Sequence, residues 1–294
     1  MEEKGNIWCC TRFESAYPGR LLAYEGMPGA FYVKGNLPDE ERKTVAIVGA
    51  RACSAYGAHQ AYHFGKSLAE HGVQVISGLA RGIDGKAHLG ALDGGGKTFA
   101  VMGCGVDICY PAEHRRLYER MIREGGGVLS EFDNGTPPCG RNFPQRNRII
   151  SGLADLILVV EAKARSGSLI TASYALEQGK TVYALPGRVG DALSEGCNRL
   201  IGDGAGIAYS VETILEELKI SFGKQEDLQR KNKIRLASQE EMVYSCLGLY
   251  PKNIEEIVHE MPFSAREISG ILLNLELKGL IEEPVKNYYA RAGG

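Results

Sequence analysis

The sequence predicts an α/β protein with a doubly wound, extended Rossmann-like, mostly parallel sheet and a small C-terminal winged-helix-like domain. Two patterns predict this architecture. After a polar segment, three helical patterns and a ribbon-like ending follow the α/β part of the chain. Before it, amphipathic stretches separate short continuous apolar runs, as in a buried parallel sheet: TVAIVG, VQVIS, KTFAVM, GVLS, DLILVVEA and KTVYALP.

Four segments follow from these patterns. Residues 1–43 are a lead-in rich in Pro, Gly and Tyr, for which we expect short turns and one strand. Residues 44–219 are the Rossmann-like domain, whose first long helix is closed by Gly72. Residues 220–237 are polar without an apolar period and read as a linker. Residues 238–294 are the winged-helix-like domain.

Composition narrows the class of protein. The 294 residues suffice for about two domains, and a formal net charge of −2 excludes a uniformly basic nucleic-acid coat. The acidic start MEEKGNIWCC and the lack of a long apolar run predict a cytoplasmic protein without a membrane segment. Eight cysteines without a C-x-x-C spacing predict reduced thiols. We expect no metal and no cofactor.

One stretch has the residues of an anion site: FPQRNRIISG from Phe143, read together with SGSLITA from Ser166. Backbone N–H groups at a helix start are unpaired and carry a partial positive charge, so a Ser/Gly turn there accepts phosphate oxygens. The planar guanidinium group of arginine can donate two parallel hydrogen bonds to the same oxygens. Between Arg141 and Arg165 there are five Lys/Arg and two acids. The alternative is an ordinary solvated basic face.

The first strand-to-helix turn, GARACSAYG, also favours phosphate. Arg51 stands where a dinucleotide fingerprint needs its second glycine, which argues against NAD. Ser54 beside the helix start and Gly57, which permits close approach, suit a phosphate. A surface turn with an incidental arginine is the other interpretation.

The next two turns carry weaker signals. SGLARGIDGKAH offers Asp84 and His88 as an acid–base pair, but we favour a capping role for Asp84 and a packing role for His88. In GCGVDICYP we expect Tyr110 to set the turn, and we expect Phe143 to be buried. The chain has no G-x-x-x-x-G-K-[ST] loop, which disfavours ATP hydrolysis of that kind.

Together these motifs resemble the DNA processing protein A family (DprA, also called Smf) over about residues 17–208. The matching pieces are G-x-R-x-x-S-x-Y-G from Gly49, SGLARGID from Ser77, GCGVDICYP from Gly103, LSE from Leu129, FPQRNRIISGL from Phe143, VVEAKARSGSLITA from Val159, LPG from Leu185 and GCNRLIGDGA from Gly196. The resemblance implies a protein without catalysis that binds and protects incoming single-stranded DNA, forms a homodimer and loads the RecA recombinase during natural transformation.

The motifs and the resemblance together define one candidate DNA- or phosphate-binding set. Its members are Arg51, Ser54, Gly57, Arg146, Asn147, Arg148, Lys163, Arg165, Ser166, Gly167 and Ser168. Because these turns offer few aromatic groups for base edges, we expect weak sequence selectivity.

Two other functions stay open at this point. The fold also resembles lysine-decarboxylase-like phosphoribohydrolases, which act on nucleoside monophosphates; SGSLIT with Glu161 or Glu177 would take those roles, but the double glycine of that group is absent. The other is a nucleotide-sensing regulator that reads DNA through its winged helix. Residues 238–294 hold five Lys/Arg and nine Glu, a net of −4, so we expect this domain to contact protein.

Overall fold

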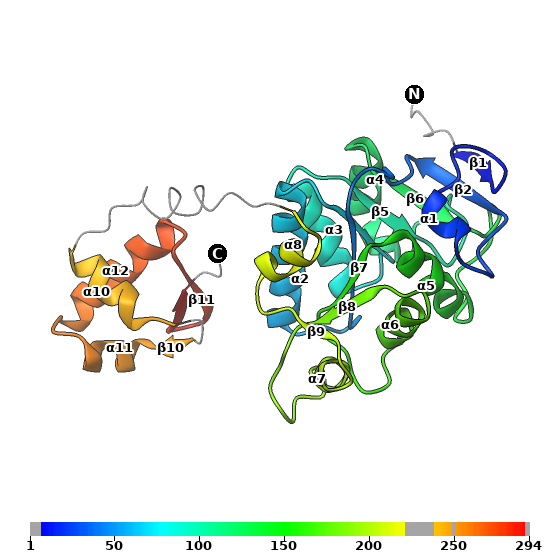
Figure 1. The fold of residues 1–294 in the computed structure, drawn as a ribbon. Helices are drawn as coiled ribbons and strands as arrows, with labels where there is room; N and C mark the ends of the chain where they lie inside the picture. The colour runs from blue at the N-terminus through cyan, green and yellow to red at the C-terminus, as the bar shows by residue number, and fades with distance from the viewer. Residues whose placement is uncertain (1–6, 221–237, 249–250, 292–294) are drawn as a thin grey trace. The chain divides into compact units, whose positions relative to one another are not determined.

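A computed structural model describes residues 7–220, 238–248 and 251–291 of the chain. They belong to two compact units, Met1–Phe222 and Gly223–Gly294 (Figure 1). Almost all of the expected linker, residues 220–237, lies outside the described residues. Among the helices that the structure describes, none has the length and apolar character to cross a membrane.

The first unit is built on one nine-stranded sheet. Its strands are β1 (Ile7–Thr11), β2 (Ala30–Gly35), β3 (Thr44–Val48), β4 (Gln74–Ser77), β5 (Thr98–Val101), β6 (Gly127–Ser130), β7 (Leu156–Val159), β8 (Thr181–Ala184) and β9 (Gly206–Ile207). Their order is β1-β2-β6-β5-β4-β3-β7-β8-β9, and all neighbours from β6 to β9 are parallel. All six strands that the apolar runs predict are therefore confirmed.

Helices cover both faces of this sheet, as a doubly wound fold requires. They are α1 (Gly19–Leu22), α2 (Ala55–Glu70), α3 (Ile83–Asp93), the 3-10 helix η1 (Ala112–His114), α4 (Arg115–Arg123), α5 (Asn142–Leu153), α6 (Gly167–Glu177), α7 (Glu195–Gly202) and α8 (Val211–Glu217). Figure 1 shows α2, α3 and α8 on one face of the sheet and α5 and α6 on the other.

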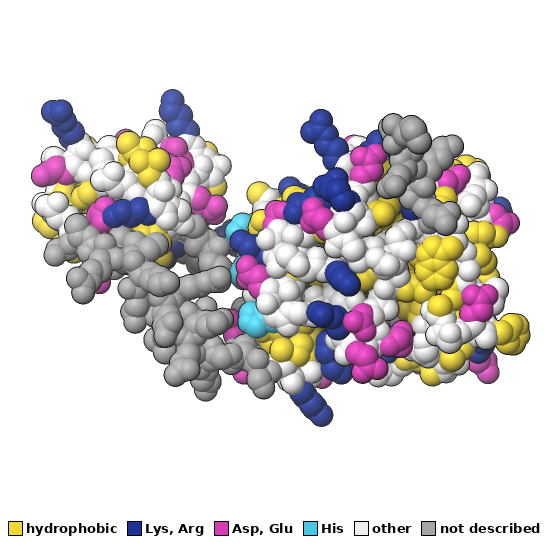
Figure 2. All heavy atoms as spheres, turned by 90° about the horizontal axis from the view of Figure 1, so that it is seen from above, with side chains coloured by type: hydrophobic (Ala, Val, Ile, Leu, Met, Phe, Trp, Pro, Cys, Tyr) yellow, Lys and Arg dark blue, Asp and Glu magenta, His cyan; other side chains and the backbone are white. Residues whose placement is uncertain are grey.

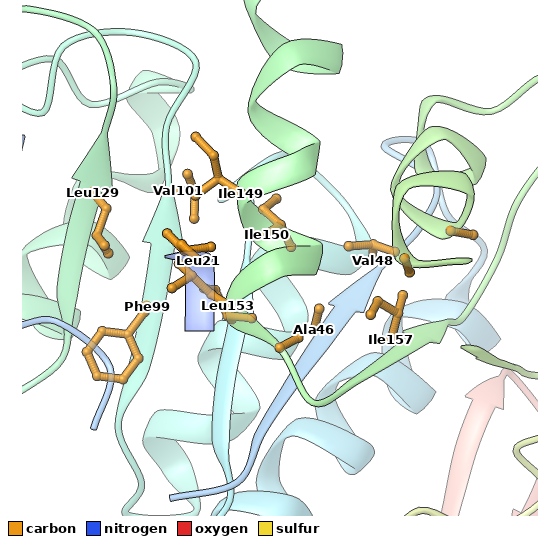
Figure 3. Close-up of a cluster of buried hydrophobic side chains, with 14 of the residues drawn as sticks. Leu21, Ala46, Val48, Phe99, Val101, Leu129, Ile149, Ile150, Leu153 and Ile157 are labelled. Carbon is orange, nitrogen blue, oxygen red and sulfur yellow. The ribbon is translucent and has the colours of Figure 1, made fainter. Parts of the chain in front are cut away.

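The period of two along a strand divides the core between these faces. In β3, Val45 and Ile47 pack with α2 and α3, whereas Ala46 and Val48 pack with α5 and α6. Figure 3 shows this second layer, in which Ile150 of α5 lies near Val48. Both faces of β3 are fully covered, which explains why the strand reads as a continuous apolar run.

The lead-in differs from the expectation. Residues 1–43 were expected to supply one strand, but they supply two, β1 and β2, with α1 between them. β2 pairs antiparallel with β6, so this segment extends the main sheet. The short edge strand β9 was also not predicted; with two residues, it is too short to show a pattern.

Within its described residues, the second unit has three helices and three strands: α10 (Ser238–Cys246), β10 (Lys252–Asn253), α11 (Ile254–Glu260), α12 (Ala265–Leu277), β11 (Ile281–Val285) and β12 (Tyr288–Arg291), with sheet order β10-β12-β11. Ser264 and Glu267 form a capping box at the start of α12. Asn253 caps α11 through the N–H of Glu255, while the reciprocal bond from Glu256 is not formed. A winged-helix arrangement of helices and ribbon results.

The contact between α2 and α3 depends on glycine. A Cβ on Gly90 would lie 2.1 Å from the backbone oxygen of Tyr62, so Gly90→Ala forces the two helices apart. We expect it to lower the free energy of unfolding by about 1–3 kcal/mol and the thermal midpoint by several degrees. Gly202→Ala is the matched control because nothing lies within 4 Å of its Cβ position. A midpoint for Gly90→Ala equal to that of the control would contradict this packing.

Candidate nucleic-acid interface

A cleft of about 550 Å³ opens at the carboxyl ends of the parallel strands. Strand β3 lies between β4 and β7, so the chain order reverses there, and open α/β sheets bind ligands at such a point. The cleft is lined by Val48, Gly49, Arg51, Ala80, Asp84, Tyr110, Pro138, Gly140, Phe143, Pro144, Arg146, Asn147, Ile150, Ser166, Gly167, Ser168 and Thr171. Six of the eleven predicted site residues, Arg51, Arg146, Asn147, Ser166, Gly167 and Ser168, are among them.

The start of α6 lies at the cleft and has the geometry that suits an anion. Ser166 is the N-cap, and its Oγ accepts a hydrogen bond from the N–H of Ser168 at 3.4 Å. Gly167 is exposed, and no atom lies within 4 Å of the position of its missing Cβ. A phosphate can therefore approach the backbone of Gly167 and the positive end of this helix closely.

Asn147 ties this helix start to α5. Its Nδ2 donates to the carbonyl oxygen of Gly167 at 3.2 Å. The amide therefore holds the turn that presents the anion site. Lys163 and Arg165 do not line the cleft, but both are exposed on the loop that leads into α6. They extend the positive charge beside the cleft along the path into the anion site.

An aromatic wall, formed by Tyr110 and Phe143, lines the same cleft. The two rings stack with centroids 5.6 Å apart and an interplanar angle of 28°. The guanidinium of Arg51 lies 5.1 Å from the centroid of Phe143. Tyr110 is 41% exposed. Phe143, which was expected to be buried, is half-buried, and two aromatic rings line a cleft for which few aromatic groups were expected. That Tyr110 sets the turn stays a prediction.

Arg146 forms part of the cleft floor as a buried cation. It is 4% exposed, and its Nη1 donates to the carbonyl oxygens of Gly78, at 3.0 Å, and of Val101. Burial lowers its pKa to about 10, so the group stays charged at neutral pH. Arg146 was predicted to bind a phosphate through its guanidinium. Its Nη1, however, already donates hydrogen bonds to backbone carbonyl oxygens at the ends of β4 and β5.

Asp84 is the buried counter-charge of Arg146. Its Oδ2 accepts from the N–H groups of Gly78 at 3.1 Å and Ala80 at 3.4 Å, so it holds the turn after β4. Burial raises the pKa of Asp84, and the charge of Arg146 opposes that rise. His88 is fully buried against Thr98 Oγ1 at 2.7 Å, and burial lowers its pKa to about 3. The favoured packing role of His88 is confirmed.

Ser54 and Gly57 hold a carboxylate instead of facing the cleft. Ser54 caps α2, and its N–H and Oγ both donate to the carboxylate of Glu161. A Cβ on Gly57 would lie 2.3 Å from that carboxylate. The glycine therefore makes room for Glu161, which is 6% exposed. This corrects the phosphate roles expected for both residues, because their polar groups and space are occupied.

Arg148 also lies outside the cleft lining. Its guanidinium forms a bidentate pair with Glu131, with Nη2 2.7 Å from Oε2, and its Nε donates to the carbonyl oxygen of Gly26 at 3.0 Å. Only 15% of its side chain is exposed. Arg148 thus fastens the lead-in to α5 and the end of β6, which corrects its expected place in the phosphate site.

The sheet and the cleft define a Rossmann-like α/β protein with a cleft at the carboxyl edge of its sheet. Residues 8–219 match the family model described as DNA recombination-mediator protein A, and residues 229–283 match the DprA winged helix domain. The chain belongs to this family, known as DprA or Smf, as the sequence motifs predict.

Similar proteins agree with this assignment. The chain is 49% identical to Protein Smf of Escherichia coli K12 over 206 residues, which are 70% of this chain and 55% of that relative. It is 44% identical to DNA processing protein DprA of Streptococcus pneumoniae over 206 residues, 70% of this chain and 72% of the relative. The chain thus spans about half the length of the Escherichia coli protein.

Two solved structures share the fold. The X-ray structure of DprA from Streptococcus pneumoniae has a TM-score of 0.67 and 41% identity, covering 74% of this chain and 75% of that one. DNA processing protein A from Helicobacter pylori, solved to describe its single-stranded DNA binding mode, has a TM-score of 0.64 and 25% identity, covering 74% of this chain and 98% of that one.

The buried pair predicts different roles for two arginines of one cleft. Arg146→Ala leaves Asp84 as an uncompensated buried charge, and we expect it to lower the free energy of unfolding by about 3–5 kcal/mol. Arg51→Ala, at an exposed position, should change it by less than about 0.5 kcal/mol. The double variant Asp84→Asn/Arg146→Met should recover part of the loss. Thermal unfolding of the three variants checks this; equal midpoints for the two single variants would contradict it.

Proposed function

We propose that this chain binds single-stranded DNA in the cleft without catalysis and acts in recombination by protecting incoming strands and loading RecA. One observation carries the proposal: the helix start at Ser166–Ser168, the exposed Arg51 and the Tyr110–Phe143 wall share one cleft. The helix start binds a phosphate, and the aromatic wall offers a ring face on which a base can stack. A nucleotide unit has both groups.

The aromatic wall favours a single strand over a duplex. In a duplex, each base stacks on its neighbours, so a protein ring reaches a base face only after unstacking. A single strand presents its bases freely, and stacking on an aromatic ring tolerates any base. Backbone N–H groups at α6 read phosphate and carry no sequence information. Weak sequence selectivity follows from both.

Local charge supplies the attraction. The chain has a net charge of −2, and on the face in Figure 2 the Lys and Arg side chains of the first unit are interspersed with Asp and Glu. Arg51, Lys163 and Arg165 are all exposed, so a strand that crosses the cleft meets positive charge at the cleft and beside it. The single-stranded DNA binding described for the Helicobacter pylori relative supports the same ligand.

The phosphoribohydrolase alternative is less well supported. Glu161, one of its candidate acids, is buried and accepts hydrogen bonds from Ser54. A carboxylate in that position stabilises the turn that carries Arg51 and does not face the cleft lining. The geometry therefore favours binding over hydrolysis.

Two variants should separate the phosphate contact from the base contact. Arg51→Ala should weaken binding to a labelled oligonucleotide and reduce the salt slope of log K by about 1, because one phosphate contact and its counterion release are lost. Phe143→Leu should weaken binding by about 1–3 kcal/mol with an unchanged slope, because stacking releases no counterion. Fluorescence anisotropy at several salt concentrations measures both.

Arg123→Ala is the matched control. Arg123 is 69% exposed in the last turn of α4, which leads to the opposite, amino end of β6. Its loss should change neither affinity nor slope. If Arg51→Ala behaved like this control, Arg51 would not contact the strand.

We further propose a homodimer, so that one strand is held at two clefts, and the loading of RecA by that complex. Light scattering should give twice the chain mass of 31.9 kDa. RecA filaments should form faster on protected single strands with the wild-type chain than with Arg51→Ala. A monomer, or equal rates for the two proteins, would count against the respective part of the proposal.

A further inference from the structure

A recess of about 70 Å³ adjoins the cleft on the side of the turn after β4. The cleft and the recess share five lining residues: Arg51, Ala80, Tyr110, Phe143 and Arg146. The recess is also lined by Arg81 of the motif SGLARGID, a residue that the proposed function does not use. Three arginines therefore surround a space that is far smaller than the cleft, which is typical of an anion site.

The guanidinium of Arg146 has an unused donor at this recess. Nη1 donates to the carbonyl oxygens of Gly78 and Val101, but the buried Nε has no acceptor among the residues that the structure describes. A buried donor without an acceptor is unfavourable, and an oxygen of a bound ligand would satisfy it. Burial, and secondarily the like charge of Arg51, lower the pKa of Arg146, so the two cations repel each other. An anion in the recess that both line relieves this repulsion.

A rigid turn holds the backbone of Arg81 beside the recess. Leu79, two residues earlier, is fully buried and has a φ of 55°, in the left-handed region that few residues other than glycine adopt. Asp84 accepts hydrogen bonds from the N–H groups of Gly78 and Ala80 in the same turn. Backbone strain of this kind persists only where the surrounding structure fixes it. The position of Arg81 is thus set before a ligand arrives, which lowers the cost of binding.

Arg81 already binds a carboxylate in the geometry that suits a phosphate. Its Nε and Nη2 donate to the two carboxylate oxygens of Glu113 at 2.8 and 2.9 Å. The side chains of this pair are 64% and 51% exposed, and an exposed ion pair contributes little to stability. A phosphate accepts the same two parallel hydrogen bonds. Glu113 can therefore be exchanged for a phosphate at low cost.

The size of the recess selects the end of a strand. Its volume of about 70 Å³ is far below the roughly 300–1,000 Å³ of pockets that enclose larger ligands, so a phosphate group fits and a nucleoside does not. An internal phosphate carries a sugar on each side, whereas a terminal phosphate carries one, which can lie in the cleft. A terminal phosphate also has a charge of about −1.5 to −2 at neutral pH. The three arginines of the recess outnumber their two acidic partners, Asp84 and Glu113.

We propose that the recess binds the terminal phosphate of a single strand, with Arg81 and Arg146 as donors and Arg51 as a cation shared with the cleft. The proposal rests on the proposed function, because the nucleotides that follow the terminal phosphate lie in the cleft. On binding, Arg81 exchanges the carboxylate of Glu113 for the phosphate. Arg81 thus determines a preference for strand ends over internal segments.

Three internally labelled oligonucleotides of one sequence test the proposal on the full chain. One carries a 5′-phosphate, one carries a 3′-phosphate, and one has hydroxyls at both ends. In fluorescence anisotropy, at least one phosphate-ended strand should bind about tenfold more tightly than the hydroxyl-ended strand, because it gains charge-assisted hydrogen bonds. The end that gains identifies the polarity of the bound strand. A hydroxyl-ended strand one nucleotide longer controls for charge, because its additional phosphate is internal, and it should not show this gain.

Two variants connect the preference to the recess. Arg81→Ala should abolish the preference for the phosphate-ended strand, and Glu113→Gln should increase it, because the competing carboxylate is lost. Arg115→Ala is the matched control: Arg115 pairs with Glu119 at similar exposures, 69% and 55%, and lines neither the recess nor the cleft. It should leave the preference as it is in the wild-type chain.

Equal affinities for all three ends would overturn the proposal, as would an undiminished preference in Arg81→Ala. An equal loss for phosphate-ended and hydroxyl-ended strands in that variant would also overturn it, because Arg81 would then contact internal phosphates. Failure of the proposed function gives a different result, since no strand would then bind, whatever its ends.

Discussion

The buried charge of Arg146 is the interaction on which the cleft depends. From α5 it reaches the carbonyl oxygens of Gly78 after β4 and Val101 at the end of β5, while Asp84 of α3 holds the N–H groups of the same turn. Neither charge is tolerated alone in a buried position. The two therefore fix four elements, α3, α5, β4 and β5, relative to one another before any ligand binds, and this preorganisation lowers the cost of binding.

The structure divides the arginines of the sequence motifs between support and contact. In FPQRNR, Arg146 supports the floor and Arg148 fastens the lead-in through Glu131. Glu161 supports the neighbouring turn through Ser54 and so positions the exposed Arg51. Since these supporting groups already have hydrogen-bond partners, we propose that the attraction for a polyanion depends on the exposed Arg51, Lys163 and Arg165 and on the start of α6. A chain of net charge −2 can thus bind DNA at one place.

The sequence predicts the elements that follow local rules. Strands buried on both faces read as apolar runs, and Ser166–Gly167–Ser168 reads as a helix start, so both could be identified. The partners of the motif residues are distant in the chain: Glu161 lies 107 residues from Ser54, and Glu131 lies 17 from Arg148. No local pattern shows that these polar groups are already occupied. Tyr110 and Phe143 were missed for the same reason, because their stacking exists only after folding.

The central claim is that the cleft holds a single strand through a phosphate and a base together. Competition for a labelled single-stranded oligonucleotide by unlabelled single strand, blunt duplex and nucleoside monophosphate tests it most directly. We expect the single strand to compete strongly and the duplex weakly. The monophosphate should compete only at far higher concentration and without being hydrolysed, since one nucleotide fills one cleft and gains nothing from the flanking cations. Equal competition by the duplex, or release of free base from the monophosphate, would contradict it.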